Sequence, residues 1–294
     1  MSLQNLLDQV QNKKNFISLD DYATFCYQYL SFIANGLQAV IISKNEYNYC
    51  FFQYKQDGGF AITRPINRDL MLSLEEFESA RKTFHEILPH IRDLKNEFEI
   101  RNTINRFVYT CQQSIGATLD ALPAGKSNQA RKINGDLFER YIRRILFDMG
   151  LGVREGTVSL PVAIDDKVQF HMKYQHDLII EKDGILKAIG SVKTSSKDRL
   201  DKVFIDKFLY NRLVGIDVPH FAVFLHDIQR KGREPNYGVN TTFLTNRYKG
   251  YTVRLNPLDG VYYCDMRPIM REDSLLQQTI KTLDYLLVED VWEF

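Results

Sequence analysis

Residues 176–199 read HDLIIEKDGILKAIGSVKTSSKDR, and the rest of the fold is best understood outward from this stretch. The apolar run HDLII and the segment ILKAIGSVK are separated by KDG, a sequence typical of a hairpin turn. We therefore expect a β-hairpin here. Residues 200–215 then predict a helix that ends at Gly215. The apolar run HFAVFLHDI (220–228) is typical of a strand buried in the centre of a sheet.

On the N-terminal side of the hairpin, the sequence predicts a further helix. Residues 122–135 are polar, small and basic, and we interpret them as a loop. Asn134 is a plausible N-cap for a helix over residues 135–150 that ends at Gly150 and Gly152. A helix, a hairpin, a helix and a buried strand in this order indicate an α/β fold, with a mixed central sheet flanked by helices.

The two ends of the chain add further elements. In the first third we expect a helix over residues 19–35, strands over 37–43 and 47–55, a turn at 57–59 and helical segments over 74–97 and 98–120. In the last third we expect strands over 252–256 and 260–266 and an amphipathic helix over 274–288. The first third is therefore predicted to be a separate α/β subdomain.

Composition and charge narrow the function. The chain has 294 residues, a net charge of +1 and four scattered cysteines without zinc-ligand spacing, so we expect no disulfide scaffold or zinc site, and a reducing cytoplasm. No apolar run approaches the length of a signal or membrane segment. Residues 126–144 carry six basic residues against two acids, and residues 193–212 carry six against three. These clusters are either solvated helix faces or local patches for a polyanion such as DNA.

The hairpin carries residues that suit phosphodiester chemistry. Metal-dependent cleavage needs hard oxygen ligands and a cation beside the attacking water. Asp177 enters the first strand, while Ser191 and Lys193 are two apart on the return strand and therefore share a face. An acid at the start of a hairpin with a lysine on its return strand resembles the PD-(D/E)XK nucleases. Two positions depart from that pattern, because His176 replaces the proline and Ser191 replaces the second acid.

Asp206 is placed to compensate for Ser191. It follows Lys193 by thirteen residues, inside the predicted helix, and Glu139 on the preceding helix is a second auxiliary acid. The stretch SVKTSSKDR with an acid at position 206 resembles the EcoRII-like branch of type II restriction endonucleases, which recognises CCGG, CCNGG and CCWGG. In that branch the second acid lies on the following helix, usually as Glu. Alternatives without a function remain. Glu139 could pair with Arg143 on the helix surface, and Asp206 could be an ordinary surface acid. Asp201 is a nearby acid that competes with Asp206 for the role of metal ligand.

The resemblance covers about residues 125–230 and also implies how DNA is read. By resemblance, Lys197, Asp198 and Arg199 read consecutive C:G pairs, since Arg and Lys donate to guanine and a carboxylate accepts from cytosine N4. Similarly, Gln129 contacts a base edge while Arg131 and Lys132 meet phosphates. Some members of the branch flip bases into pockets of an arginine and an aromatic residue. Arg106 with Phe107 or Tyr109 is a candidate here, although core packing of these aromatics is the simpler interpretation, and Trp292 is too near the C-terminus.

The resemblance implies a restriction-endonuclease-like fold and a Mg²⁺-dependent restriction enzyme that cuts double-stranded DNA as a homodimer. Asp177 and Asp206 are the expected metal ligands, with Glu139 assisting and Lys193 acting beside the scissile phosphate. Residues 1–120 are the expected dimerisation or DNA-recognition subdomain, and residues 121–294 the catalytic core with C-terminal elements. A cognate DNA methyltransferase is expected as a functional partner.

Two alternatives remain open from the sequence. One is a PD-(D/E)XK repair nuclease that reads DNA structure instead of sequence. The other is a non-catalytic, sequence-specific DNA-binding protein, suggested by the serine at position 191. His176 and His226 have no partner spacing typical of a histidine-dependent nuclease, and we interpret them as structural.

Overall fold

The computed structural model describes residues 1–56 and 59–294, so the turn predicted at 57–59 lies largely outside the described residues. Its central sheet consists of β5 (Gly152–Ile164), β6 (Lys167–Lys182), β7 (Ile185–Lys193), β8 (His220–His226), β11 (Gly260–Asp265) and β12 (Ile280–Thr282). The strand order is β12-β11-β8-β7-β6-β5. Pairing is antiparallel from β5 to β7 and parallel from β7 to β12. The predicted mixed sheet is confirmed.

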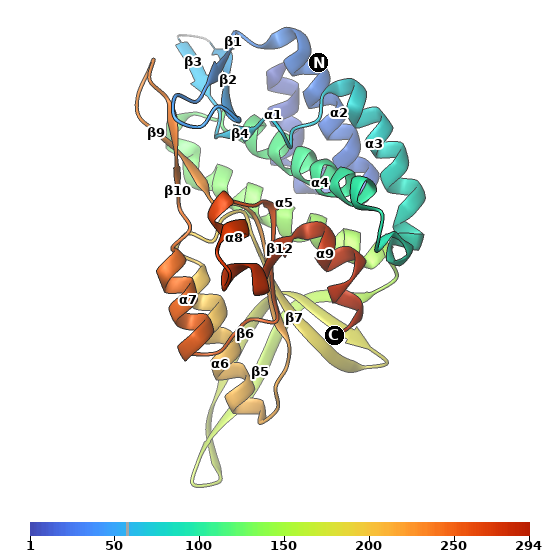
Figure 1. Ribbon diagram of the computed structural model, residues 1–294, viewed down its shortest axis with the longest axis vertical. Helices are drawn as coiled ribbons and strands as arrows, with labels where there is room; N and C mark the ends of the chain where they lie inside the picture. Colours follow the sequence, from blue (N-terminus) through green and yellow to red (C-terminus); the bar gives the residue numbers. More distant parts are fainter. Residues whose placement is uncertain (57–58) are drawn as a thin grey trace.

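Helices cover both faces of the sheet (Figure 1). They are α4 (Phe98–Leu119), α5 (Ser127–Asp148) and α9 (Leu283–Val288) on one face, and α6 (Leu200–Val214), α7 (Thr245–Arg254) and α8 (Pro268–Glu272) on the other. The fully buried β8 shows the two-residue period of a strand: Val223 and Leu225 join the core cluster of the first face, and Ala222 and Phe224 join that of the second. The buried central strand predicted at 220–228 is thereby confirmed.

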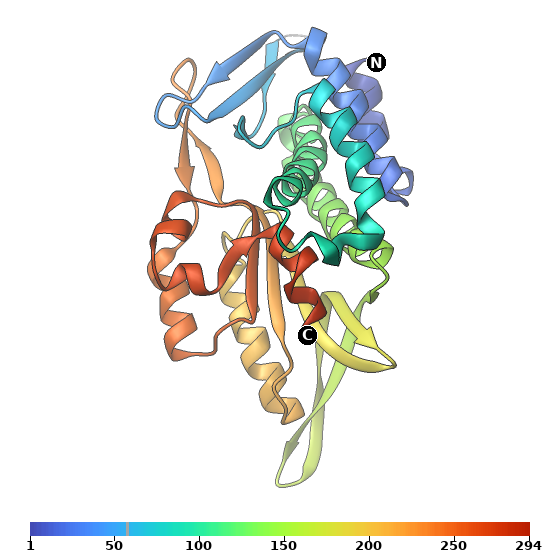
Figure 2. The same ribbon diagram turned by 45° about the vertical axis from the view of Figure 1, so that its right-hand side comes forward.

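The N-terminal segment lies at one end of the molecule, opposite the projecting β5–β6 hairpin (Figures 1 and 2). It consists of α1 (Leu3–Gln11), α2 (Leu19–Gly36), a small sheet of β1 (Ala39–Ile42), β2 (Tyr49–Gln56), β3 (Gly59–Ile62) and β4 (Ile66–Asn67), and α3 (Leu74–Ile87). Tyr22 of α2 stacks on Tyr141 of α5 with ring centroids 4.4 Å apart, and its hydroxyl donates to the carbonyl of Leu137. The predicted α/β content is present, and its core is continuous with that of the sheet.

Short elements complete the chain. They are the hairpin of β9 (Ile228–Lys231) and β10 (Gly238–Thr241) and the 3₁₀ turns η1 (Lys13–Asn15), η2 (Leu88–Leu94), η3 (Ala124–Lys126), η4 (Leu276–Gln278) and η5 (Asp290–Trp292). All four cysteines are buried, and none forms a disulfide in the described chain. Among the described residues, no helix combines the length and apolar composition needed to cross a bilayer.

The start of α5 corrects the predicted loop over 122–135. The helix begins at Ser127, and Asn134 lies inside it instead of capping it. Asn134 is buried, and its side-chain and backbone oxygens both accept from the amide of Gln112 on α4. A tertiary hydrogen bond thus offsets the low helix propensity of asparagine.

Two predictions in the last third were wrong. Of residues 252–256, predicted as a strand, 252–254 form the end of α7 and 255–256 follow it, because this helix buries Tyr248 against Phe204 and Phe243. The single helix predicted over 274–288 is instead η4, β12 and α9. The β-branched segment Ile280–Thr282 pairs in parallel with Val261–Tyr263 of β11, and this pairing prevents a continuous helix.

Candidate active site

The hairpin of β6 and β7 places Asp177 at the point where the two strands separate. Asp183 and Gly184 form its turn with positive φ values of 54° and 75°, as a two-residue hairpin turn requires. The β7 strand pairs with β6 only as far as Leu178 and Gly190. Immediately beyond, the register between β5 and β6 shifts, so that β6 has one extra residue around Asp177. Such a bulge redirects side chains, and here it lies beside the candidate site.

Asp177, Glu139 and Lys193 form one ionic cluster. The Lys193 Nζ atom lies 2.6 Å from Asp177 Oδ2 and 2.6 Å from Glu139 Oε1. The backbone N–H of Val192 also donates to Asp177 Oδ2, at 2.8 Å, which ties the carboxylate to the lysine-bearing strand. Side-chain exposure is 14% for Asp177, 25% for Glu139 and 30% for Lys193, so none of the three side chains is fully buried.

Burial and charge shift the pKa values in this cluster. Burial, and then the neighbouring Asp177 carboxylate, raise the pKa of Glu139 above its usual range. For Lys193, burial acts to lower the pKa, but the charges of Asp177 and Glu139 outweigh it and raise the pKa. Lys193 is therefore an ammonium ion at neutral pH, suited to stabilising negative charge and not to acting as a base.

Asp206 of α6 lines the same cavity as this cluster. A cavity of about 590 Å³, hereafter the acidic cavity, is lined by the carboxylates of Asp136, Glu139, Asp177 and Asp206 together with Ser191, Lys193, Arg199 and Lys202. Asp206 is paired with Lys202, one helical turn earlier, while Asp201 pairs with Arg247 outside the cavity lining. Glu139 does not bond Arg143, which pairs with Glu155 instead. The cavity thus gathers Asp177, Glu139, Lys193 and Asp206.

Asp136 and Lys202 are among the lining residues that the sequence reasoning missed. Asp136 precedes Glu139 by three residues on α5, so the helical repeat alone could have placed it on the same face. Lys202 precedes Asp206 by four residues on α6, which again is a helix-neighbour spacing.

The donor set suits a hard divalent cation. Mg²⁺ prefers oxygen ligands and is usually held by one or two carboxylates with several waters. Asp177 with Asp206 or Glu139 provides such oxygens within one cavity. Within residues 1–56 and 59–294, no three His, Cys, Asp or Glu side chains converge into a ready-made metal centre. Asp177 together with Asp206 or Glu139 thus offers two carboxylates, a number that usually holds a hydrated Mg²⁺ ion.

The basic residues predicted to meet DNA lie beside this cavity. A second hollow of about 390 Å³, hereafter the basic groove, is lined by Arg131, Lys132, Lys193, Lys197 and Arg199, with Asp136 and Glu139 shared between the two hollows. Lys197, Asp198 and Arg199 are exposed in the loop between β7 and α6. Gln129, Arg131 and Lys132 are exposed near the start of α5, although Gln129 does not line either hollow. The acidic cavity and the basic groove form one continuous concave surface.

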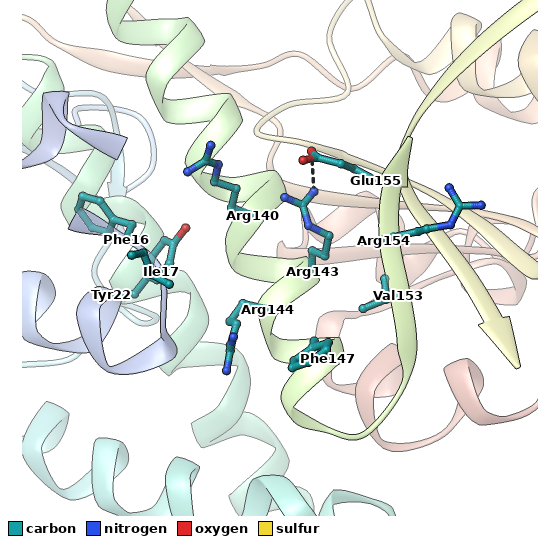
Figure 3. A pocket seen from close by; sticks show the side chains of 10 residues that line it. All are labelled: Phe16, Ile17, Tyr22, Arg140, Arg143, Arg144, Phe147, Val153, Arg154 and Glu155. Atoms are coloured by element: carbon teal, nitrogen blue, oxygen red, sulfur yellow. Dashed lines mark hydrogen bonds and ion pairs between the residues drawn. The ribbon is translucent and has the colours of Figure 1, made fainter. Parts of the chain in front are cut away.

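A third cavity, of about 470 Å³, lies farther along α5 and is lined by four arginines (Figure 3). Arg143, Arg144 and Arg154 are each paired with a carboxylate, namely those of Glu155, Asp148 and Glu181. Only Arg140 has no carboxylate partner among the described residues; it donates to the carbonyl of Lys13. Since most of its positive charge is balanced locally, this cavity is less suited to a phosphate than the basic groove.

The other sequence candidates occupy structural positions. His176 and His226 are buried, and burial lowers the pKa of both, to about 3 for His226, so both are neutral. Phe107 and Tyr109 are buried in the core, and Arg106 pairs with Glu76. Trp292 packs against Arg92. These placements match the structural interpretation of the histidines and aromatics.

Comparison with known proteins bears on the fold. No protein-family model and no curated protein matches the sequence. Among solved structures, the type IIP restriction endonuclease Kpn2I superposes with a TM-score of 0.71 at 18% identity, covering 99% of this chain and 97% of that chain. The chain has a restriction-endonuclease-like fold. The PspGI–substrate DNA and AgeI–DNA complexes match at 14% and 12% identity over 74% of this chain and 92% and 87% of theirs, with TM-scores of 0.39 and 0.36.

Proposed function

We propose that this chain is a type II restriction endonuclease that makes Mg²⁺-dependent double-strand cuts at a C/G-rich palindrome containing CCNGG or a related sequence. The observation that carries the proposal is the shared bonding of Lys193 to Asp177 and Glu139, in a cavity that Asp206 also lines. The adjoining basic groove gives a phosphodiester backbone a path to this cluster.

The residues have distinct roles in the proposed reaction. Asp177 and Asp206, assisted by Glu139, would hold Mg²⁺, which supplies Lewis-acid stabilisation of negative charge on the phosphate. The Lys193 ammonium would orient the attacking water and donate to the scissile phosphate. The water oxygen bonds to phosphorus while the bond to the 3′ oxygen breaks. The attacking water releases one proton to solvent and the leaving 3′ oxygen takes one up from solvent, which leaves a 5′-phosphate and a 3′-hydroxyl.

The proposal extends to recognition and assembly. Lys197 and Arg199 line the basic groove, and Asp198 lies between them on the same exposed loop; their donors and acceptor suit guanine and cytosine edges. Gln129, Arg131 and Lys132 would add a base-edge contact and phosphate contacts. A homodimer would bring one active site to each strand of a palindrome. A cognate methyltransferase would protect the same site in the host.

One observation favours a non-catalytic DNA-binding protein as the second candidate. Ser191 lines the acidic cavity where the superfamily pattern has a carboxylate, so the metal set depends on residues from α5 or α6. Digestion of a fully sequenced plasmid in Mg²⁺, with sequencing of all fragment ends, separates the two. Discrete ends at a shared C/G-rich palindrome support the restriction enzyme. An intact plasmid in both Mg²⁺ and Mn²⁺ supports the binding protein, whereas scattered ends at flaps or single strands indicate a repair nuclease.

A further inference from the structure

A buried carboxylate lies directly behind the loop that carries the proposed DNA-reading residues. Asp227 follows β8 and has no exposed surface. Its oxygens accept from the Ser195 hydroxyl at 3.0 Å and from the backbone N–H of Ser196 at 2.8 Å, and the Ser196 hydroxyl donates to it as well. The loop Thr194–Arg199 therefore has two consecutive residues fixed to one acid.

The same carboxylate is held from the opposite side by the core of the fold. The Tyr263 hydroxyl of β11 donates at 2.6 Å, and the Thr242 hydroxyl donates at 3.1 Å. The Asp227 carbonyl accepts from the Thr242 backbone N–H at 2.9 Å. Asp227 thus bridges a surface loop and two elements distant in sequence.

No basic side chain of the described chain pairs with Asp227, so neutral hydroxyl and amide donors alone stabilise it. Burying a carboxylate without a counter-ion is expensive, and the arrangement persists only where many donors converge. Five donated hydrogen bonds for two oxygens meet that condition. A hydrophobic residue would fill the same volume without this desolvation cost. The carboxylate is therefore better explained by its hydrogen bonds, which hold the loop in position.

Backbone hydrogen bonds also hold both ends of this loop. The Thr194 carbonyl accepts from the His226 N–H at 3.3 Å, immediately after Lys193. The Ser196 carbonyl accepts from the N–H groups of Arg199 and Leu200, each at 3.0 Å, where α6 begins. Between these anchors Asp198 has a φ of 57°, a left-handed conformation that needs support from its surroundings.

We infer that Asp227 is a positioning residue for sequence recognition: it fixes the loop Thr194–Arg199 so that Lys197, Asp198 and Arg199 face the DNA in one arrangement. This inference rests on the proposed restriction activity. Asp227 contacts neither DNA nor the reacting atoms in this account, and it acts through Ser195 and Ser196. A loop held from behind in one conformation discriminates better between bases than one that can adapt to a wrong base.

The test compares substitutions on the two sides of the carboxylate. Asp227→Asn retains the volume but converts one acceptor into a donor, and Ser196→Ala removes only the loop-side hydroxyl. Tyr263→Phe is the matched control, because it removes one hydroxyl donor from the core side. Cleavage of the cognate site and of sites with one base changed is measured for each variant, with KM and kcat determined separately.

We expect Asp227→Asn and Ser196→Ala to reduce discrimination against the changed sites by about tenfold or more, mainly through KM, since each disturbs bonds to a charged group. Tyr263→Phe should lower the melting temperature while leaving discrimination within about twofold. Equal loss of discrimination in Tyr263→Phe and Ser196→Ala, in proportion to loss of stability, would overturn the positioning role.

A DNA-free measurement keeps this inference separate from the proposed function. Amide hydrogen exchange should become faster at residues 194–200 in Asp227→Asn, with β7 and β8 still protected. Unchanged protection at 194–200 would overturn the inference even if the wild-type enzyme cuts DNA. Failure of the wild-type protein to cut any duplex would instead contradict the proposed function, and the exchange result would still decide the role of Asp227.

Discussion

Lys193 and Asp227 are each surrounded by a cluster of polar groups: Lys193 directly precedes the loop that joins β7 to α6, and Asp227 bonds residues of that loop. Lys193 is 30% exposed and is held by two carboxylates, whereas Asp227 is fully buried and is held by neutral donors. The first cluster is open, so water, a phosphate or a metal can replace its internal partners. The second is closed, and all its bonds serve to hold the chain. The proposed chemistry and the positioning of the loop thus depend on two different groups, one exposed and one buried.

The largest expected effect comes from removing a carboxylate from the cluster around Lys193. Asp177→Asn removes a charge that holds Lys193 and that, in the proposed reaction, would also help to hold Mg²⁺. We expect cleavage to fall by at least about 10³-fold, because the transition-state charge loses its preorganised partners. Specific DNA binding should persist, and its measurement by fluorescence anisotropy is the control. If the variant cuts at more than a tenth of the wild-type rate, Asp177 is not part of the active site.

Asp265 is a second buried carboxylate, and its titration shows how such a group affects the stability of the fold. It accepts from the Tyr49 hydroxyl and, at 2.8 Å, from the Asn67 amide, and burial raises its pKa from 3.8 to about 6. Between these values the folded chain binds a proton that the unfolded chain does not. The free energy of unfolding therefore falls as the pH rises through this range, and the loss is complete above the folded pKa.

Asp265→Asn removes this titration. The free energy of unfolding of the wild type should fall by on the order of 3 kcal/mol from pH 4 to pH 7 relative to that of the variant, which lacks this titration. Denaturant unfolding of both proteins at several pH values measures the difference. A difference that stays constant over this range would show that Asp265 does not titrate in this way.

Arg199→Ala tests the exposed side of the loop. The guanidinium lines both the acidic cavity and the basic groove, and a bidentate contact to guanine is worth about 1–3 kcal/mol, so we expect specific binding to weaken roughly 10- to 100-fold. Arg254→Ala, at the exposed end of α7, is the matched control for loss of one positive charge. Wild-type affinity in Arg199→Ala would exclude this residue from recognition.

The smallest expected effect concerns the pair of Lys202 with Asp206. This exposed pair is worth at most about 1 kcal/mol, and it occupies an oxygen that the proposed metal site needs. Lys202→Ala should therefore lower the Mg²⁺ concentration for half-maximal cleavage by a few-fold at most. A higher Mg²⁺ requirement would mean that Lys202 assists the site instead of competing for Asp206.

The sequence predicted those features whose signals are local. The hairpin, its turn and the spacing of Asp177, Ser191 and Lys193 depend on strand alternation and turn chemistry within one short stretch. Asp206 and Glu139 were placed through the family resemblance, and both line the cavity.

The failures depended on partners far along the chain. Asn134 is stabilised inside α5 by Gln112, and Ile280–Thr282 becomes a strand only because β11 provides an edge. The bonds of Asp227 come from residues 195, 196, 242 and 263, and no local pattern joins them. An acid ending the apolar run HFAVFLHD was the one available signal.

The most direct test of the account compares two lysines of the same strand. Lys193 is bonded to the carboxylates of Asp177 and Glu139, whereas Lys187 lies six residues earlier on β7, outside the acidic cavity. Cleavage of a sequenced plasmid in Mg²⁺ is measured for wild type, Lys193→Ala and Lys187→Ala. We expect discrete fragments from wild type and Lys187→Ala and intact plasmid with Lys193→Ala. The same fragments from Lys193→Ala at a comparable rate would contradict it.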